Sequence, residues 1–110
     1  MVLHVGRLFG LLLLATVMLT GPALAGEVHE VVVTGGDFSQ EVIEAKVGDT
    51  IRFVHNDDVD HTIYSEDENH AFEAGDLEKG GTYDLVLTHA GTTDVFCNEM
   101  DMHLVINVTE

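Results

Sequence analysis

The chain has 110 residues, of which 45% are hydrophobic, and its formal net charge is −16 at pH 7. This length allows one small domain with a modest core. A strongly acidic surface repels nucleic acid and anionic lipid, which excludes nucleic-acid binding and favours basic protein partners. Solubility, or adaptation to a salty medium, explains the same charge equally well.

The first 25 residues have the order of a secretory signal peptide. Arg7 supplies the positive start, Leu8–Leu19 an apolar run, and Ala23–Ala25 a small-x-small cleavage site. The run is short of the roughly 20 residues that span a bilayer, although an uncleaved anchor is the alternative. We expect cleavage after Ala25, an exported or periplasmic domain over 26–110, and no stable membrane insertion. That domain would carry all 20 acidic residues against three basic ones, a net charge of −17.

The first half of this domain contains four strand signals. Residues 28–33 are rich in β-branched side chains, 41–47 alternate in polarity, and both segments stop at glycine. Residues 50–55 and 61–65 follow, and they flank an acidic turn. Segments of this length and pattern, bounded by turn residues, are typical of short strands.

The second half begins with a polar, glycine-containing stretch over 66–81, which we expect to be a long connection with room for a helical turn. Three further strands are predicted over 82–88, 92–97 and 104–108. Many short strands at intervals of about 8–12 residues indicate an all-β sandwich or barrel.

The only cysteine lies at the end of one predicted strand, in a cluster of soft metal ligands. Cys97 is followed by Met100, Met102 and His103. One cysteine forms no internal disulfide, so in an exported chain it is a free or intermolecular thiol or a metal ligand. Thiolate, thioether and imidazole suit copper. The competing interpretation is a sandwich without copper, in which cysteine and methionine only fill the core.

A site of this kind needs a histidine from a distant strand, and His61 is the candidate because it begins the strand after the acidic turn. Blue-copper sites combine two histidines and a cysteine with a weak axial methionine. The remaining histidines are assigned to the surface by default. His55 and His70 lie in acidic surroundings and form at most a weak second metal patch.

The order of these segments resembles the cupredoxins, and within them the amicyanin, pseudoazurin and plastocyanin group. Residues 47–62 are similar to that family's strand, turn and first copper histidine. Residues 72–87 resemble the segment between the two halves of the site, and 90–97 the strand that delivers the copper cysteine. The resemblance implies an eight-strand Greek-key β-sandwich that binds one copper ion near one end, with His61 and Cys97 as ligands.

The final loop departs from the family pattern. Amicyanin-like chains have Cys-x-x-His-x-x-Met, whereas this chain has Cys97-x-x-Met100-x-x-His103. His103 could be equatorial with Met100 axial, or the two roles could be exchanged. Strict strand alternation instead turns Met102 toward the core and His103 away, leaving Met100 and Met102 to serve with His61 and Cys97. From the preserved spacing we expect His103 to be a ligand.

The resemblance implies a monomeric, non-enzymatic protein that shuttles one electron, as Cu(I)/Cu(II), to a redox partner with a basic docking patch. Copper capture and delivery to an acceptor is the alternative, because methionine-rich sites suit Cu(I). The sequence contains no nucleophile elbow and no phosphate loop, so an enzyme is the weakest interpretation.

Overall fold

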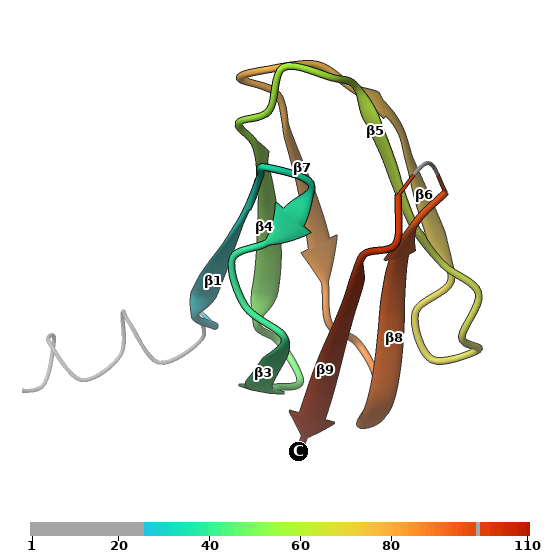
Figure 1. The fold of residues 1–110 in the computed structure, drawn as a ribbon. Helices are drawn as coiled ribbons and strands as arrows, with labels where there is room; N and C mark the ends of the chain where they lie inside the picture. The colour runs from blue at the N-terminus through green and yellow to red at the C-terminus, as the bar shows by residue number, and fades with distance from the viewer. Residues whose placement is uncertain (1–25, 99) are drawn as a thin grey trace, which may run out of the picture.

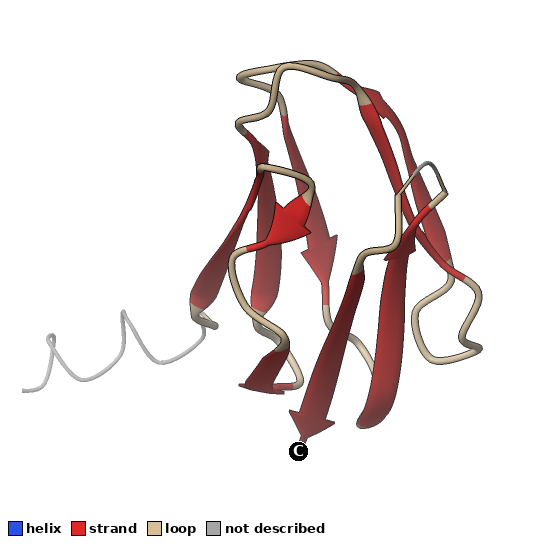
Figure 2. Ribbon diagram, in the orientation of Figure 1, coloured by secondary structure: helices blue, strands red, loops and turns tan. Residues whose placement is uncertain are grey.

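Nine short strands make up the secondary structure of the computed structural model, which describes residues 26–98 and 100–110 (Figures 1 and 2). The predicted leader, residues 1–25, lies outside the described residues. The strands are β1 Val28–Thr34, β2 Asp37–Phe38, β3 Val42–Lys46, β4 Thr50–His55, β5 His61–Ser65, β6 Phe72–Leu77, β7 Thr82–Val86, β8 Gly91–Cys97 and β9 His103–Thr109.

The strands form two sheets that face each other across the core (Figure 1). The four-stranded sheet has the order β2-β1-β4-β7, and the five-stranded sheet has the order β3-β9-β8-β5-β6. The pairs β1–β4 and β3–β9 are parallel, and all other pairs are antiparallel. This is the expected Greek-key β-sandwich, with nine strands where the sequence signals indicate seven and the family resemblance implies eight.

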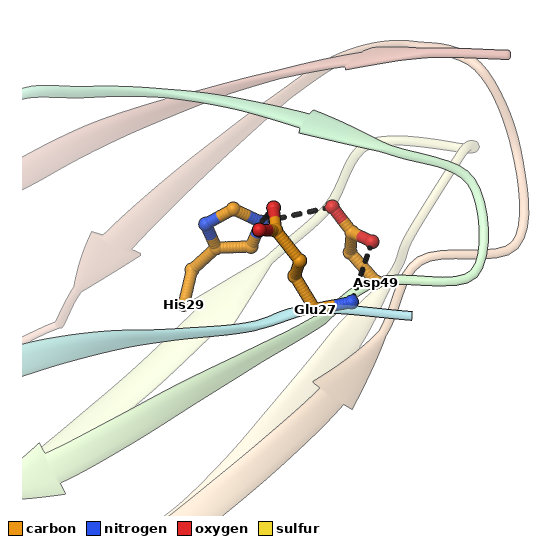
Figure 3. A group of neighbouring side chains, drawn as sticks. All are labelled: Glu27, His29 and Asp49. Carbon is orange, nitrogen blue, oxygen red and sulfur yellow. Dashed lines mark hydrogen bonds and ion pairs between the residues drawn. The ribbon is translucent and has the colours of Figure 1, made fainter. Parts of the chain in front are cut away.

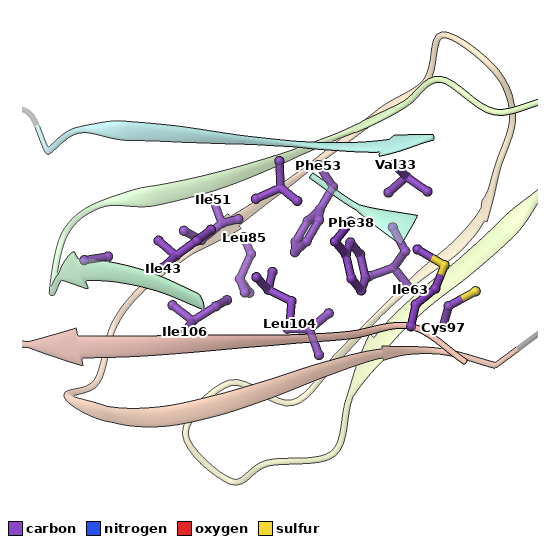
Figure 4. Close-up of a cluster of buried hydrophobic side chains, with 14 of the residues drawn as sticks. Val33, Phe38, Ile43, Ile51, Phe53, Ile63, Leu85, Cys97, Leu104 and Ile106 are labelled. Atoms are coloured by element: carbon purple, nitrogen blue, oxygen red, sulfur yellow. The ribbon is translucent and has the colours of Figure 1, made fainter. Parts of the chain in front are cut away.

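The core follows from side-chain alternation on the strands. In β4, Ile51 and Phe53 are fully buried, whereas Arg52 between them points outward and binds Asp84 of β7. β9 buries every second residue in the same way. The inward-facing apolar side chains of both sheets meet in one cluster (Figure 4). Because adjacent residues of a strand face opposite sides, this pattern also decides which polar side chains turn inward.

One expected connection contains a strand. Residues 66–81, expected to be a long connection with room for a helical turn, instead include β6, which pairs with β5 at the edge of the five-stranded sheet. Phe72 explains the placement of β6, because its ring stacks on Phe53 and on Tyr83 of the opposite sheet, at centroid distances of 6.0 and 5.4 Å. The polar composition of this segment gave no strand signal, because the outer face of β6 is in contact with solvent.

The described part of the chain has no helix long and apolar enough to cross a membrane.

Candidate metal centre

His61 and Cys97 meet at one end of the sandwich. Strand β5 pairs with β8 so that Ile63 lies opposite Cys97, and His61, two residues earlier, faces the same side of the sheet. The Nδ1 atom of His61 lies 3.4 Å from the Sγ atom of Cys97. His61 is fully buried and Cys97 is 6% exposed. The fold therefore brings together an imidazole and a thiol that are 36 residues apart in the chain.

A carboxylate holds the far side of the His61 ring. Nε2 of His61 lies 3.0 Å from Oδ2 of Asp57, which also accepts a hydrogen bond from the backbone nitrogen of Gly36. Both interactions lower the pKa of Asp57 to about 2, the hydrogen bond to His61 being the larger cause. An ionised carboxylate only accepts, so Nε2 carries the ring hydrogen and the lone pair of Nδ1 faces Cys97. Carboxylates orient metal-binding histidines in this way.

Met102 shares the buried face with Cys97. In the β8–β9 ladder, Val95 lies opposite Leu104 and Phe96 opposite His103, so continuing the register places Met102 opposite Cys97. Met102 is 3% exposed and belongs to the same buried cluster as the cysteine. Directly opposed residues of an antiparallel pair have Cβ atoms about 5 Å apart, within reach of a thioether side chain.

His103 lies on the outer face of the same hairpin. Its ring stacks on Phe96 at a centroid distance of 4.8 Å, and its Nε2 atom lies 2.8 Å from Oδ1 of Asp94. Half of the side chain is exposed. The structure therefore does not bring His103 together with Cys97, because strand alternation turns position 103 away from the interior.

Met100 is at the surface of the loop between β8 and β9 and is 44% exposed. Its side chain crosses to the turn between β1 and β2, where a Cβ atom added to Gly36 would lie 3.0 Å from the methionine Cε. The φ angle of Gly36 is 76°, a conformation that glycine adopts without strain. Because Gly36 has no side chain, Met100 can approach the Gly36 backbone, whose nitrogen donates a hydrogen bond to Asp57.

Two histidines assigned to the surface by default are buried. His55 is 1% exposed, and its Nε2 donates to the carbonyl oxygen of Val59 at 2.7 Å. Its ring lies 5.1 Å, centroid to centroid, from that of His61. His70 is 6% exposed and bonds Thr93. The surface assignment was wrong for both, because a turn carbonyl in one case and a hydroxyl of β8 in the other supply hydrogen-bonding partners that the sequence pattern does not reveal.

A second group of possible ligands lies elsewhere (Figure 3). Within residues 26–98 and 100–110, one group of three or more His, Cys, Asp or Glu side chains has ligand atoms all within 4.8 Å of one another: Glu27, His29 and Asp49. The environment of Cys97 does not meet this criterion. Among the described residues, the sulfur of Met102 is a candidate third donor because it is buried with Cys97, whereas the imidazole of His103 would have to move to reach this end of the interior.

A scan of protein-family models finds no match to this sequence, and a search of curated proteins finds none either. Solved structures do match. A purple cupredoxin from Nitrosopumilus maritimus superposes with a TM-score of 0.65 and 21% identity, covering 74% of this chain and 99% of that one. A reduced Cu(I) form of an amicyanin variant gives 0.68 and 22%, covering 78% and 86%. The chain has the cupredoxin fold.

The copper-containing nitrite reductase of Thermus scotoductus also contains this fold. It matches with a TM-score of 0.71 and 25% identity over 83% of this chain, which corresponds to only 24% of the reductase. The cupredoxin fold is thus found both in small proteins and as a part of larger ones, so the fold alone assigns no reaction. The donor atoms at the end of this sandwich must carry the functional argument.

The donors at that end fit copper. Cys97 supplies sulfur, His61 supplies an imidazole nitrogen, and Met102 can supply a second sulfur, a soft set suited to Cu(I) and Cu(II). All three are among the ligands predicted from the sequence, together with Met100 and His103, whereas Asp57 is not. The signal for Asp57 was present, since it lies four residues before His61 in the acidic turn. Its role depends on how that turn folds back on the ring.

Proposed function

We propose that this chain binds one copper ion between His61 and Cys97 and acts as a one-electron carrier. The observation that carries the proposal is the 3.4 Å approach of the His61 Nδ1 atom to the Cys97 Sγ atom, with both side chains buried. The cupredoxin fold supports it, because an imidazole and a thiol brought together from separate strands are two of the three equatorial ligands of a blue-copper site.

The protein would hold the ligands in position before copper arrives. Asp57 keeps the His61 ring in the tautomer that presents Nδ1 to the sulfur, and burial excludes water from Cys97. Copper, when bound there, supplies a centre that accepts and returns one electron. A rigid, dry surrounding reduces the rearrangement that accompanies each transfer, since core side chains are closely packed.

For the third ligand we propose Met102, which faces the interior and lies opposite Cys97 in the extended register. His103 remains the competing prediction, as equatorial or axial ligand with Met100. Binding through His103 would require the start of β9 to rotate, breaking the stack with Phe96 and the contact with Asp94. A site with one imidazole and two sulfurs favours Cu(I) and a raised reduction potential.

We also propose that the copper end is the docking face for a basic redox partner. Val59 and Met100 expose apolar surface there, and the acidic turn surrounds it with Asp58 and Asp60. At 0.15 M salt the screening length is about 8 Å, so association with a basic partner should slow as salt increases. A rate that is independent of ionic strength would leave solubility as the explanation of the acidic charge.

We also propose that the protein is exported after removal of residues 1–25. Measuring the intact mass of the protein isolated from its native host tests this.

Absorption spectroscopy tests the carrier function. The purified protein with Cu(II) should show intense visible absorption from thiolate charge transfer, and a redox titration should be reversible with one electron per chain. The matched control is the Cys97→Ser variant, which keeps the shape of the side chain but removes the thiol. If the wild-type protein binds no copper, the chain is a cupredoxin fold without the metal, and the proposal fails.

Copper capture and delivery is a second candidate, favoured by one observation. The outward position of His103 leaves one imidazole among sulfur donors, and Met100 is exposed where an acceptor could reach it. Incubation with a Cu(I) chelator of graded affinity separates the two functions. A carrier keeps its copper in both oxidation states, whereas a delivery protein releases Cu(I) while retaining its fold.

A further inference from the structure

A second cluster of ligand atoms lies at the other end of the sandwich, where β1 begins and the turn after β3 passes beneath it (Figures 1 and 3). The Nε2 atom of His29 lies 2.8 Å from Oδ2 of Asp49 and 3.9 Å from Oε2 of Glu27. One ligand atom from each residue lies within 4.8 Å of the other two. The cluster is independent of the proposed copper site, because it shares no residue with it.

Strand alternation makes this cluster unusual. Glu27 and His29 have the same parity as Val31 and Val33, which are fully buried core residues of β1. Their side chains therefore lie on the inner face of the sheet, at the end of the sandwich away from Cys97, which we call the open end. An apolar residue would normally cover the core at this position. The His29 side chain is 23% exposed, and that of Glu27 is 81% exposed. The cluster thus extends from the edge of the core to solvent.

Asp49 is anchored before any ligand binds. It is 5% exposed, and its two oxygens accept hydrogen bonds from the backbone nitrogens of Glu27 and Lys46. These bonds and the stronger one to His29 lower the pKa of Asp49 to about 2, so the carboxylate is charged at all ordinary pH values. The backbone therefore fixes one anionic oxygen beside an imidazole nitrogen.

There is space beside this group. A pocket of about 160 Å³ adjoins it, lined by Glu27, Asp49, Glu44 and Lys46 together with Ala45 and Thr109. The pocket is open to solvent, so a partly hydrated ion can enter it. Lys46 is the single cation among its lining residues, so carboxylates outnumber positive charges in the wall.

We propose that Glu27, His29 and Asp49 form a binding site for a divalent first-row transition cation. One imidazole nitrogen and two carboxylate oxygens are ligands of zinc, and such sites commonly keep water in the remaining position. The set contains no sulfur, so it does not favour Cu(I), and the imidazole distinguishes it from the all-oxygen sites of calcium and magnesium.

Binding exchanges a hydrogen bond for a metal bond. Nε2 of His29 donates its hydrogen to Asp49 in this structure, because the carboxylate can only accept. A cation at Nε2 takes the place of that hydrogen, and the neutral ring keeps its single proton on Nδ1 instead. No net proton is released from the neutral form. Glu27, which is exposed and free to rotate, closes the remaining distance.

The alternative is a purely structural cluster, in which the His29–Asp49 contact fastens the start of β1 to the turn before β4. Titration with zinc by calorimetry separates the two. The experiment uses the full chain with Cys97→Ser, so that thiolate binding at the opposite end does not contribute heat. We expect one zinc ion per chain in this background.

Adding His29→Ala should then weaken zinc binding by at least about tenfold, because losing even an outer partner of a metal ligand typically costs about 10- to 100-fold. Glu27→Gln, at an exposed position, should weaken binding without affecting folding. Glu30→Gln is the matched control: it removes the same charge three residues further along, within β1, but its side chain lies on the opposite face, and zinc affinity should not change.

Two outcomes overturn the proposal. Zinc affinity that is the same with and without His29, or no binding in the Cys97→Ser background, shows that the cluster is an ion pair only. If Cys97→Ser does not fold, NMR of the unsubstituted chain decides, since zinc should shift the His29 ring signals and the Asp49 amide signal. Shifts confined to His61 and its neighbours would contradict the site.

Discussion

The two ends of this sandwich carry a histidine in opposite chemical settings. At one end, His61 is fully buried, bound by Asp57 on one nitrogen and facing the sulfur of Cys97 with the other. At the other end, His29 is partly exposed and contacts two carboxylates. Both aspartates have a pKa of about 2. An ionised aspartate beside a histidine therefore does not by itself determine which metal chemistry the pair supports.

The difference is in what the second ring nitrogen meets. At the proposed copper end, Asp57 accepts a hydrogen bond from Nε2 of His61, and Nδ1 faces the buried sulfur of Cys97. At the open end, the hydrogen that Nε2 of His29 donates to Asp49 occupies the position proposed for a cation, and water has access. A carboxylate–histidine pair thus orients a proposed metal ligand at one end and forms part of the proposed metal site at the other.

The largest effect should come from Cys97→Ser. Because the thiolate is the source of the charge-transfer band, we expect complete loss of intense visible absorption with Cu(II), while zinc binding at the Glu27–His29–Asp49 cluster is retained. Absorption and zinc calorimetry on the same preparation measure both. If the band survives, Cys97 is not a copper ligand, and the proposed difference in metal chemistry between the two ends is wrong.

The next effect concerns the two faces of the β8–β9 hairpin. Met102→Ala should cost about 2–5 kcal/mol of unfolding free energy, as for other buried large-to-small replacements, and should impair copper retention. Met102→Leu is the control, because it keeps the volume at a cost under about 1.5 kcal/mol but removes the sulfur.

His103→Ala completes that test. As an exposed residue, it should change the unfolding free energy by no more than about 0.5 kcal/mol. If Met102 is the ligand, the copper spectrum of His103→Ala should equal that of the wild type. Loss of copper in His103→Ala but not in Met102→Leu would restore the prediction from loop spacing, and would mean that β9 starts later when copper is bound.

A smaller effect should follow removal of the charge that orients His61. In Asp57→Asn, the ring loses its ionised partner, and copper affinity should fall by about 10- to 100-fold, the usual range for such partners. Asp58→Asn is the control, since Asp58 is exposed and binds Lys79 instead. Equal affinities of the two variants would show that Asp57 does not support the site.

The smallest effect should appear in the pH dependence of stability, through His70. Burial, and secondarily the charge of His89, lower the pKa of His70 below its usual value of 6.5. The unfolded chain therefore binds this proton more readily, and stability should be complete above pH 6.5 and decrease as pH falls from there through the lower folded pKa. Its Nε2 accepts from the backbone nitrogens of Thr88 and His89, bonds that protonation breaks.

Chemical denaturation of the metal-free protein between pH 5 and 8 measures this effect, and His70→Gln should flatten it. Leu87, which directly precedes Thr88, is hydrogen-bonded through its backbone to Gly48 and Asp49. Breaking the bonds to His70 should therefore first destabilise the end of the sandwich that contains Asp49. Hydrogen exchange should accelerate at Thr88 before Asn98. Equal acceleration at both would indicate uniform unfolding rather than a weaker end.

Much of the fold was readable in the sequence because local patterns decide it. Residues 50–55 and 61–65 were predicted with the bounds of β4 and β5, since alternation and turn residues mark them clearly. Strand β2, with two residues, and β6, with a polar outer face, gave no comparable signal. Both depend on partners distant in the chain: β2 on pairing with β1, and β6 on the stack of Phe72 between Phe53 and Tyr83.

The sequence by itself determined the donor types, the strand parity and the pairing of His61 with Cys97 through family resemblance. Parity also indicated correctly that position 103 faces outward, although the loop spacing argued otherwise. Only the tertiary structure placed Asp57 on the His61 ring, buried His55 and His70, and joined His29 to Asp49. Asp57 lies only four residues from His61, but which carboxylate of the acidic turn meets the ring depends on how that turn folds. The contacts of His29 and His70 join residues 20 and 23 positions apart, and their geometry exists only after the strands have packed.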